Sequence, residues 1–158
     1  MERVAIALGS NLGQPHAHLE HAITLLQSDL SDMAVSDLVE TEPVGVEPQP
    51  RFLNGALTGY WDRDARSLLE RLLDIERACG RRRPHSGAPR TLDLDLILFG
   101  ARVIDEAGLC VPHPRFRERE FVLRPLAQIA PDMIDPTTGL TVGELYRRWK
   151  EHHACASH

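Results

Sequence analysis

The sequence has few cysteines and no long apolar segment, and both deficits exclude classes of protein. Its three cysteines, Cys79, Cys110 and Cys155, are far apart and form no Cys-x-x-Cys pair. This scatter argues against a zinc site or a disulfide framework and fits a reducing cytoplasm. No apolar run approaches the length that crosses a bilayer, and no basic segment followed by a long apolar stretch opens the chain. We therefore expect a cytoplasmic protein with no secretory signal and no membrane partner.

The chain also lacks an excess of positive charge. It has 18 lysines and arginines against 23 aspartates and glutamates among 158 residues, for a formal net charge of −5 at pH 7. A general nucleic-acid-binding surface is therefore not expected, and any anion site must be local. Internal repeats, linkers and low-complexity segments are missing as well. We expect a single domain over residues 1–158, with a disordered tail at residues 151–158.

A glycine-rich segment near the N-terminus lacks the ending of a phosphate-binding loop. Gly9-Ser10-Asn11-Leu12-Gly13 follows a strand predicted at residues 4–8 and precedes a helix that begins near Pro15. Backbone amides in such a segment can hold phosphate. Because the Gly-Lys-Ser/Thr ending is missing, the pattern favours an ordinary tight turn.

The most informative stretch is Pro89-Arg90-Thr91-Leu92-Asp93-Leu94-Asp95-Leu96-Ile97-Leu98-Phe99, whose alternation predicts a β-strand. Strict alternation puts the leucines at positions 92, 94, 96 and 98 on one face, and residues 91, 93, 95, 97 and 99 on the other. Asp93 and Asp95 then share a face, with their Cα atoms roughly 6.5–7 Å apart. Carboxylates this close repel one another unless a cation lies between them. They are either metal ligands or ordinary aspartates of a half-solvated sheet.

A basic segment lies directly before these carboxylates and favours the metal-ligand interpretation. Its members are Arg81, Arg82, Arg83, His85 and Arg90. Acidic side chains that can bind a metal, beside basic side chains that can bind a polyphosphate, are typical of a phosphoryl-transfer site. Residues 81–89, like residues 41–51, are also rich in proline and contain glycine. We expect both segments to be mobile loops beside the site.

An aromatic ring and an amide share one face of another strand, predicted at residues 52–61. Phe52 and Asn54 could bind a flat heterocycle by stacking and paired hydrogen bonds, or Phe52 could be ordinary core. The remaining predicted elements are a strand at residues 33–40, a helix capped by Asp64, a hairpin at residues 102–111, and helices at residues 121–130 and 141–149.

Five motifs, in this order and spacing, resemble the 6-hydroxymethyl-7,8-dihydropterin pyrophosphokinases, a family of folate-pathway enzymes. They are Gly9-Ser10-Asn11-Leu12, Phe52-Leu53-Asn54, Pro89-Arg90-Thr91-Leu92-Asp93-Leu94-Asp95, Val111-Pro112-His113 and Phe121-Val122-Leu123. The resemblance implies an α+β fold, a ferredoxin-like sandwich whose antiparallel sheet has helices packed on one face. It also implies transfer of the β,γ-diphosphate of ATP to the pterin hydroxymethyl group, with release of AMP.

The resemblance further implies roles for particular residues. Two magnesium ions that bridge the ATP phosphates would be held by Asp93 and Asp95, as in a two-metal clamp. The residues that would act in catalysis are Asp93, Asp95, Arg83 and Arg90. Those that would bind the pterin are Thr41, Pro43, Val44, Phe52, Asn54 and Phe121. Those that would bind the nucleotide are Glu76, Arg83, Arg90, Leu96, His113 and Arg119.

The predicted protein is a monomeric pyrophosphokinase that uses ATP and magnesium on a small-molecule substrate. It departs from the family pattern in the basic loop, where Ser86-Gly87-Ala88 replaces a tryptophan and a basic residue. Two alternatives remain open. A two-metal nucleotidyltransferase would release pyrophosphate, and a non-catalytic nucleotide- or pterin-binding module would bind its ligand without turnover. Paired metal carboxylates argue against the module, because binding alone does not need them.

Overall fold

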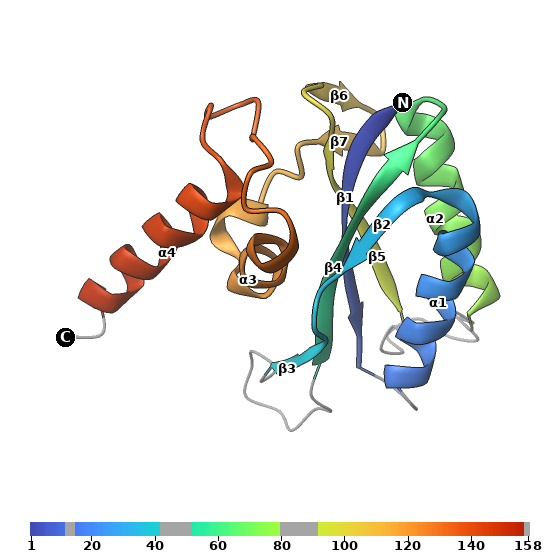
Figure 1. Ribbon diagram of the computed structural model, residues 1–158, viewed down its shortest axis with the longest axis horizontal. Helices are drawn as coiled ribbons and strands as arrows, with labels where there is room; N and C mark the ends of the chain where they lie inside the picture. Colours follow the sequence, from blue (N-terminus) through green and yellow to red (C-terminus); the bar gives the residue numbers. More distant parts are fainter. Residues whose placement is uncertain (12–14, 42–51, 80–91, 157–158) are drawn as a thin grey trace.

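A computed structural model describes residues 1–11, 15–41, 52–79 and 92–156 of the chain. Within these residues an antiparallel sheet occupies the centre of the molecule (Figure 1). Its strands lie in the order β2 (Ser31–Val35), β4 (Phe52–Trp61), β1 (Glu2–Ser10) and β5 (Asp93–Phe99). A further short strand, β3 (Val39–Thr41), pairs with the beginning of β4. The α+β class and the antiparallel sheet are therefore confirmed.

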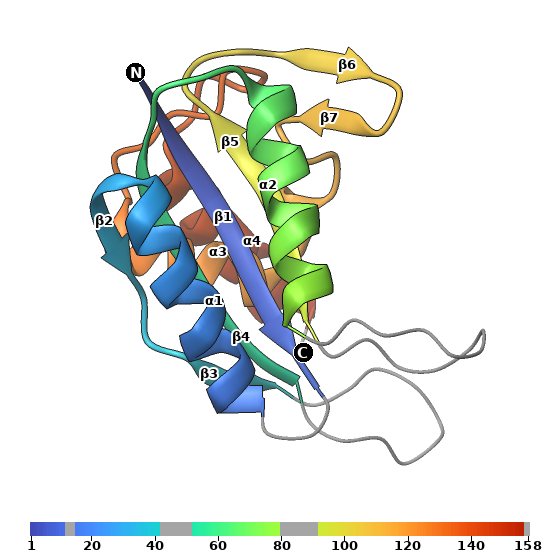
Figure 2. The same cartoon turned by 90° about the vertical axis from the view of Figure 1, so that its right-hand side faces the viewer.

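One face of the sheet is covered by α1 (Pro15–Asp29) and α2 (Ala65–Ala78), as Figure 2 shows. The cap predicted for α2 is confirmed, since the side chain of Asp64 accepts a hydrogen bond from the backbone N–H of Ser67 at 2.9 Å. Large apolar side chains fill this interface, among them Ile6, Leu8, Leu26, Leu57, Trp61, Leu68 and Leu72. Their burial makes this side of the molecule its main hydrophobic core.

The opposite face is covered too, whereas the resemblance implies helices on one face only. There α3 (Glu120–Ile129) packs on the sheet, and α4 (Val142–Ala156) packs on α3 (Figure 1). The physical reason is that this face is also apolar, because Ala5, Ala7 and Ala56 point toward α3 and must be removed from water. The sheet is thus a middle layer, and small side chains let α3 approach it.

The C-terminal helix is longer than predicted. Residues 151–156, expected to be disordered, form the last turns of α4, while residues 157 and 158 lie outside the described residues. The small hairpin is confirmed as β6 (Ile104–Glu106) and β7 (Leu109–Val111), and a short 3₁₀ turn, η1 (Phe116–Glu118), precedes α3. In the part of the chain that the structure describes, no helix is long and apolar enough to cross a membrane.

Strict alternation fails in β5 because the strand contains a β-bulge. Ala5 of β1 lies opposite Leu98, but its neighbour Ile6 lies opposite Leu96, so Ile97 is the extra residue. Beyond the bulge the faces exchange: Leu98 joins the α3 side and Phe99 joins the α1 and α2 side. The two aspartates precede the bulge and keep the shared face that the alternation predicts.

The strand predicted at residues 33–40 is divided into β2 and β3. Ser36, between the two, accepts a hydrogen bond from the backbone N–H of Ala56 through its side-chain Oγ at 2.8 Å. Leu38 packs where a side chain on residue 55 would stand, because a Cβ on Gly55 would come within 2.6 Å of Leu38 Cδ2. This local hydrogen bonding replaces the ladder and turns Asp37 toward α3.

Candidate functional site

Strand register brings the site residues from three motifs into one row across the α3 side of the sheet. Asp93 of β5 lies opposite Gly9 of β1, and Gly9 lies opposite Asn54 of β4. Asp95 lies opposite Ala7 in the adjacent row. Residues directly opposite one another on one face have Cβ atoms about 5 Å apart. Segments far apart in sequence therefore present two carboxylates and an amide to the same small area.

Gly9 belongs to β1, which corrects the expectation that it begins a turn. A Cβ on Gly9 would come within 3.1 Å of the Asn54 side-chain Oδ1, so the absence of a side chain leaves room for that amide. Residues 12–14 of the glycine-rich motif lie outside the described residues. The glycine is thus needed where two strands meet, between the carboxylates and the amide.

The two aspartates face outward beside small neighbours. Asp93 is half-buried and Asp95 is exposed, and the residues opposite them on β1 are a glycine and an alanine. In the described part of the chain, no three side chains of His, Cys, Asp or Glu gather into a metal site. The donor set still fits magnesium, because this ion is commonly held by one or two carboxylates, with water and substrate phosphates as its other ligands.

His113 is fixed beside Asp95 by hydrogen bonds with the backbone. Its backbone N–H donates to the carbonyl of Ile97 at 2.9 Å, and its ring Nδ1 accepts from the backbone N–H of Arg115 at 3.1 Å. Burial lowers the pKa of the ring, and the positive charges of Arg119 and Arg115 lower it further. The negative charge of Asp95 raises the pKa, but by less than the other effects lower it. The ring is therefore neutral at pH 7 and has its proton on Nε2, where it can donate to an anion.

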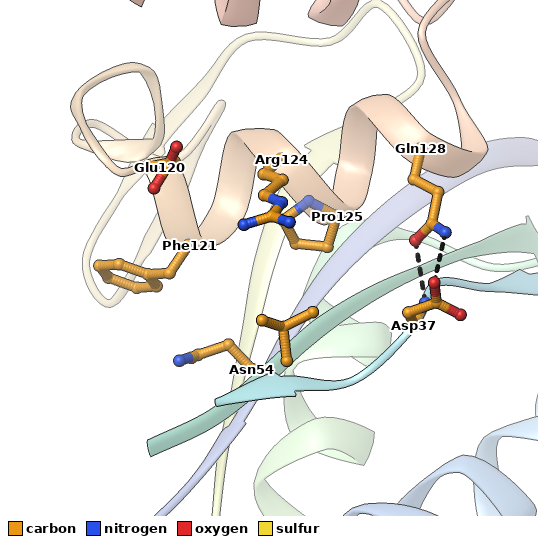
Figure 3. Close-up of a pocket in the computed structure, with 8 residues that line it drawn as sticks. Asp37, Asn54, Glu120, Phe121, Arg124, Pro125 and Gln128 are labelled. Carbon is orange, nitrogen blue, oxygen red and sulfur yellow. Dashed lines mark hydrogen bonds between the residues drawn. The ribbon is translucent and has the colours of Figure 1, made fainter. Parts of the chain in front are cut away.

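A cavity of about 240 Å³ lies between α3 and the strands β3 and β4. Its lining comprises Asp37, Val39, Asn54, Glu120, Phe121, Arg124, Pro125 and Gln128. Figure 3 shows Phe121 and Asn54 near one end of this cavity, and Asp37 and Gln128 near the other. Phe121 is 41% exposed and Phe52 is half-buried, and neither belongs to the buried core. Their partial exposure favours a binding role for both rings over a place in the core.

The far end of the cavity is closed by a pair of hydrogen bonds. The backbone N–H of Asp37 donates to Gln128 Oε1 at 2.9 Å, and Gln128 Nε2 donates to Asp37 Oδ2 at 2.8 Å (Figure 3). This clasp joins the C-terminal half of α3 to the segment between β2 and β3. It sets how far the helix stands from the strands at that end.

Two of the expected nucleotide residues, Glu76 and Leu96, do not join the row on the α3 side. Glu76 is buried on α2, where its Oε2 accepts a hydrogen bond from the backbone N–H of Leu94 at 2.7 Å. Leu96 belongs to the core under α1 and α2. Because β5 is an edge strand among the described residues, both lie next to backbone groups that face outward along that edge.

Several expected site residues cannot be placed. Arg83, Arg90, Pro43 and Val44 lie outside the described residues, as do residues 42–51 of the first predicted loop and all of the second. The backbone of Thr41 is described and lies opposite Phe52 at the start of β4. Arg119 stands directly before α3, and its guanidinium carbon lies 5.6 Å from the centre of the Phe121 ring.

Sequence reasoning missed part of the cavity and one buried amide. Arg124 and Gln128 follow Phe121 by three and seven residues, a spacing that places all three on one helix face and could have indicated them. Asn11 was treated as a turn residue, but it is only 6% exposed, and its Oδ1 has no hydrogen-bond partner among the described residues. A buried acceptor without a partner is uncommon and marks a place for a donor.

Comparisons with known proteins identify the family of the chain. The model of the family described as 7,8-dihydro-6-hydroxymethylpterin-pyrophosphokinase matches residues 5–131. The 2-amino-4-hydroxy-6-hydroxymethyldihydropteridine pyrophosphokinase of Bacillus subtilis is 42% identical over 149 residues, covering 92% of this chain and 89% of that protein. The protein of the same name from Pseudomonas aeruginosa is 41% identical over 135 residues, covering 84% and 83%.

A solved structure confirms the fold. The wild-type HPPK-DHPS structure from Plasmodium falciparum superposes with a TM-score of 0.74 at 14% identity. The match covers 94% of this chain but 44% of the Plasmodium chain, so at that identity it is informative for the fold alone. Taken with the matches in sequence, the chain belongs to the 7,8-dihydro-6-hydroxymethylpterin-pyrophosphokinase family.

Proposed function

We propose that this chain transfers a diphosphate group from ATP to the hydroxymethyl group of 6-hydroxymethyl-7,8-dihydropterin, with release of AMP, as a step of folate biosynthesis. The observation that carries the proposal is the row formed by Asp93, Gly9 and Asn54, which puts acidic and heterocycle-binding groups on one face. In the reaction, the hydroxymethyl oxygen bonds to the β-phosphorus of ATP and loses its proton. The bond between that phosphorus and the bridging α-phosphate oxygen breaks.

The pterin would occupy the end of the cavity that holds Phe121 and Asn54. The ring would stack between Phe121 and Phe52, which are both outside the core, while the Asn54 amide hydrogen-bonds its edge. The remaining polar edge would be read by backbone groups at Thr41, Pro43 and Val44. This arrangement leaves the hydroxymethyl group to point along the row toward the aspartates.

The phosphates would lie over β5. Asp93 and Asp95 would hold magnesium, which would supply Lewis-acid stabilisation of the charge on the phosphates. Neutral His113, with its proton on Nε2, and the arginines Arg83, Arg90 and Arg119 would donate hydrogen bonds to phosphate oxygens. The chain would thus accelerate the reaction by positioning and electrostatics, as phosphoryl transfer generally requires.

The nucleoside end of ATP would lie along the free edge of β5. Backbone groups at Leu96 can hydrogen-bond a base there, because the edge strand leaves them without a partner strand among the described residues. Glu76 would stabilise this edge from behind through its hydrogen bond to the N–H of Leu94. Its buried position favours a supporting role at this edge over direct contact with the nucleotide.

The decisive experiment is a product assay with ATP, magnesium and the hydroxymethyl dihydropterin. We expect AMP and the pterin diphosphate in equal amounts. Release of pyrophosphate would favour the nucleotidyltransferase, and release of ADP would also reject the proposal. Saturable binding of both ligands with no product would instead favour the non-catalytic module.

The proposal includes a monomer that works in the cytoplasm on small molecules, without nucleic acid. In its support, large exposed apolar side chains of the described residues lie on separate elements, such as Val35 on β2, Leu73 on α2 and Phe121 on α3. Stable interfaces usually gather such side chains into one patch. Light scattering after size-exclusion chromatography tests the monomer, and a gel-shift assay at low salt tests the absence of nucleic-acid binding.

A further inference from the structure

A partly buried ion pair joins the turn before α3 to the segment before α4. Arg117 in η1 donates from Nε to Asp135 Oδ2 at 2.6 Å and from Nη2 to Oδ1 at 2.9 Å. Asp135 is 0% exposed. It also accepts hydrogen bonds from the N–H of Thr137 at 3.0 Å and from Thr138 Oγ1 at 2.7 Å. Four donors therefore compensate a carboxylate that has lost its contact with water.

The element that carries Arg117, η1, lies in the sequence between two of the proposed phosphate ligands. His113 precedes Arg117 by four residues and Arg119 follows it by two. The segment that leads into the turn is attached to β5, because the backbone N–H of His113 donates to the carbonyl of Ile97. The end of the turn is closed by the bond from the backbone N–H of Arg119 to the carbonyl of Phe116 at 3.2 Å. A 3₁₀ turn of this length has weak internal hydrogen bonding, so its geometry depends on external contacts.

The turn is anchored by Phe116, which is 0% exposed in the core on the α3 side, and its polar side-chain contacts come from the C-terminal segment. Besides the ion pair, the indole N–H of Trp149 in α4 donates to the carbonyl of Glu118 at 3.3 Å. Both Asp135 and Trp149 lie beyond residues 5–131, which the family model matches. A part of the chain that the family model does not cover therefore adds to the buried Phe116 in holding a turn that the model does cover.

We propose that the Arg117–Asp135 pair positions His113 and Arg119 for the phosphates of ATP, an inference that rests on the proposed function. The guanidinium forms two parallel bonds in a fixed plane, so it restrains the orientation of η1 as well as its distance from the loop. Neither member of the pair touches the substrate in this scheme. Both are positioning residues that act through the turn.

The test replaces Arg117 by lysine, which keeps the charge and removes the planar fork. Isothermal titration calorimetry measures the Kd of a non-hydrolysable ATP analogue with magnesium and, separately, of the pterin. We expect the nucleotide Kd and the KM for ATP to rise by roughly tenfold, within the hundredfold or so that a misplacement of about 1 Å can cost. The pterin Kd should stay within about twofold, because the pterin residues are held by β4 and α3.

A matched control is available on the other side of the sheet. Arg71 of α2 donates from Nε to Asp29 Oδ2 of α1 at 2.7 Å, in a partly buried pair. Arg71→Lys should lower the melting temperature without changing the nucleotide Kd. Trp149→Phe keeps the packing and loses the bond to Glu118, so it should weaken nucleotide binding in the same direction but less, even if Arg117→Lys does not fold.

The outcomes separate this inference from the proposed function. An unchanged nucleotide Kd in folded variants, equal weakening of both ligands, or the same weakening in Arg71→Lys would each overturn the positioning role. Wild-type protein that binds the ATP analogue but releases no AMP rejects the proposed function, and the comparison of nucleotide Kd values still decides the role of the pair. Wild-type protein that binds no nucleotide overturns both.

Discussion

The two faces of the central sheet are built from side chains of different size. On the α1 and α2 side, β1 contributes Val4, Ile6 and Leu8, whose side chains are nearly inaccessible to solvent. On the α3 side, the same strand contributes Ala5, Ala7 and Gly9. The first interface is filled by large apolar side chains, whereas on the second face Gly9 leaves room for the Asn54 amide, and a cavity lies between α3 and the strands β3 and β4. The difference indicates that stability is concentrated on the first face and ligand binding on the second.

The largest effect should follow from removing one carboxylate on the ligand-binding face. Asp95→Asn keeps the shape of the side chain but removes a charge from the proposed magnesium site. Loss of Lewis-acid stabilisation should raise the activation free energy by several kcal/mol and so lower kcat. The melting temperature should change little, because Asp95 is exposed. Turnover across a magnesium titration measures the effect. Asp62→Asn, an exposed aspartate at the other end of β4, is the control, and near-normal turnover of Asp95→Asn at low magnesium would refute the assignment.

The second effect concerns the opposite face and should appear in stability alone. Leu72 of α2 is 0% exposed, so Leu72→Ala leaves a cavity in the main core. We expect the free energy of unfolding to fall by about 2–5 kcal/mol. Urea denaturation measures the loss. The pterin Kd of the folded fraction should be unchanged, and a large rise in it would show that the two faces are not independent.

The elements could be predicted from the sequence because their signals are local. Residues 52–61 alternate and become β4, and Asp64 carries its capping signal with it. The β-bulge at Ile97 could not be predicted, because it is a property of two paired strands and appears only in the register of β5 against β1. The presence of helices on both faces of the sheet was not predicted, for a related reason. On β1 and β4 the second apolar face is formed by Ala5, Ala7 and Ala56, and alanines contribute little to a hydrophobic pattern.

The site was predictable in the same unequal way. Alternation along single strands places Asp93 and Asp95 on one face of their strand, and Phe52 and Asn54 on one face of theirs. Their proximity depends on the strand order β4, β1, β5, which no single strand encodes. The Arg117–Asp135 pair and the Asp37–Gln128 clasp join residues on separate elements, and their side chains resemble an ordinary solvated surface when read in sequence alone.

A smaller effect should follow from removing the exposed ring of the ligand-binding face. Phe121→Ala takes away stacking and contact area from the proposed pterin site, so the pterin should bind more weakly by roughly 1–3 kcal/mol. Its stability cost should be low, because the side chain is 41% exposed. Val103→Ala, which shortens another exposed apolar side chain away from the cavity, is the control. Heavy loss of stability with full pterin affinity would make Phe121 part of the core instead.

The smallest effect should come from the clasp at the far end of the cavity. Gln128→Ala removes both hydrogen bonds to Asp37, and since both residues are exposed, water can replace the lost partners. The free energy of unfolding should therefore fall by only about 0.5–1.5 kcal/mol. Gln128→Glu should cost more than Gln128→Ala at pH 7, because its carboxylate can accept from the N–H of Asp37 but faces the like charge of the Asp37 side chain. Urea denaturation of the two variants measures the difference. The pterin Kd shows whether the clasp also shapes the cavity. If α3 moves away from the strands, the pterin Kd rises in both variants. An unchanged Kd would limit the role of the clasp to stability.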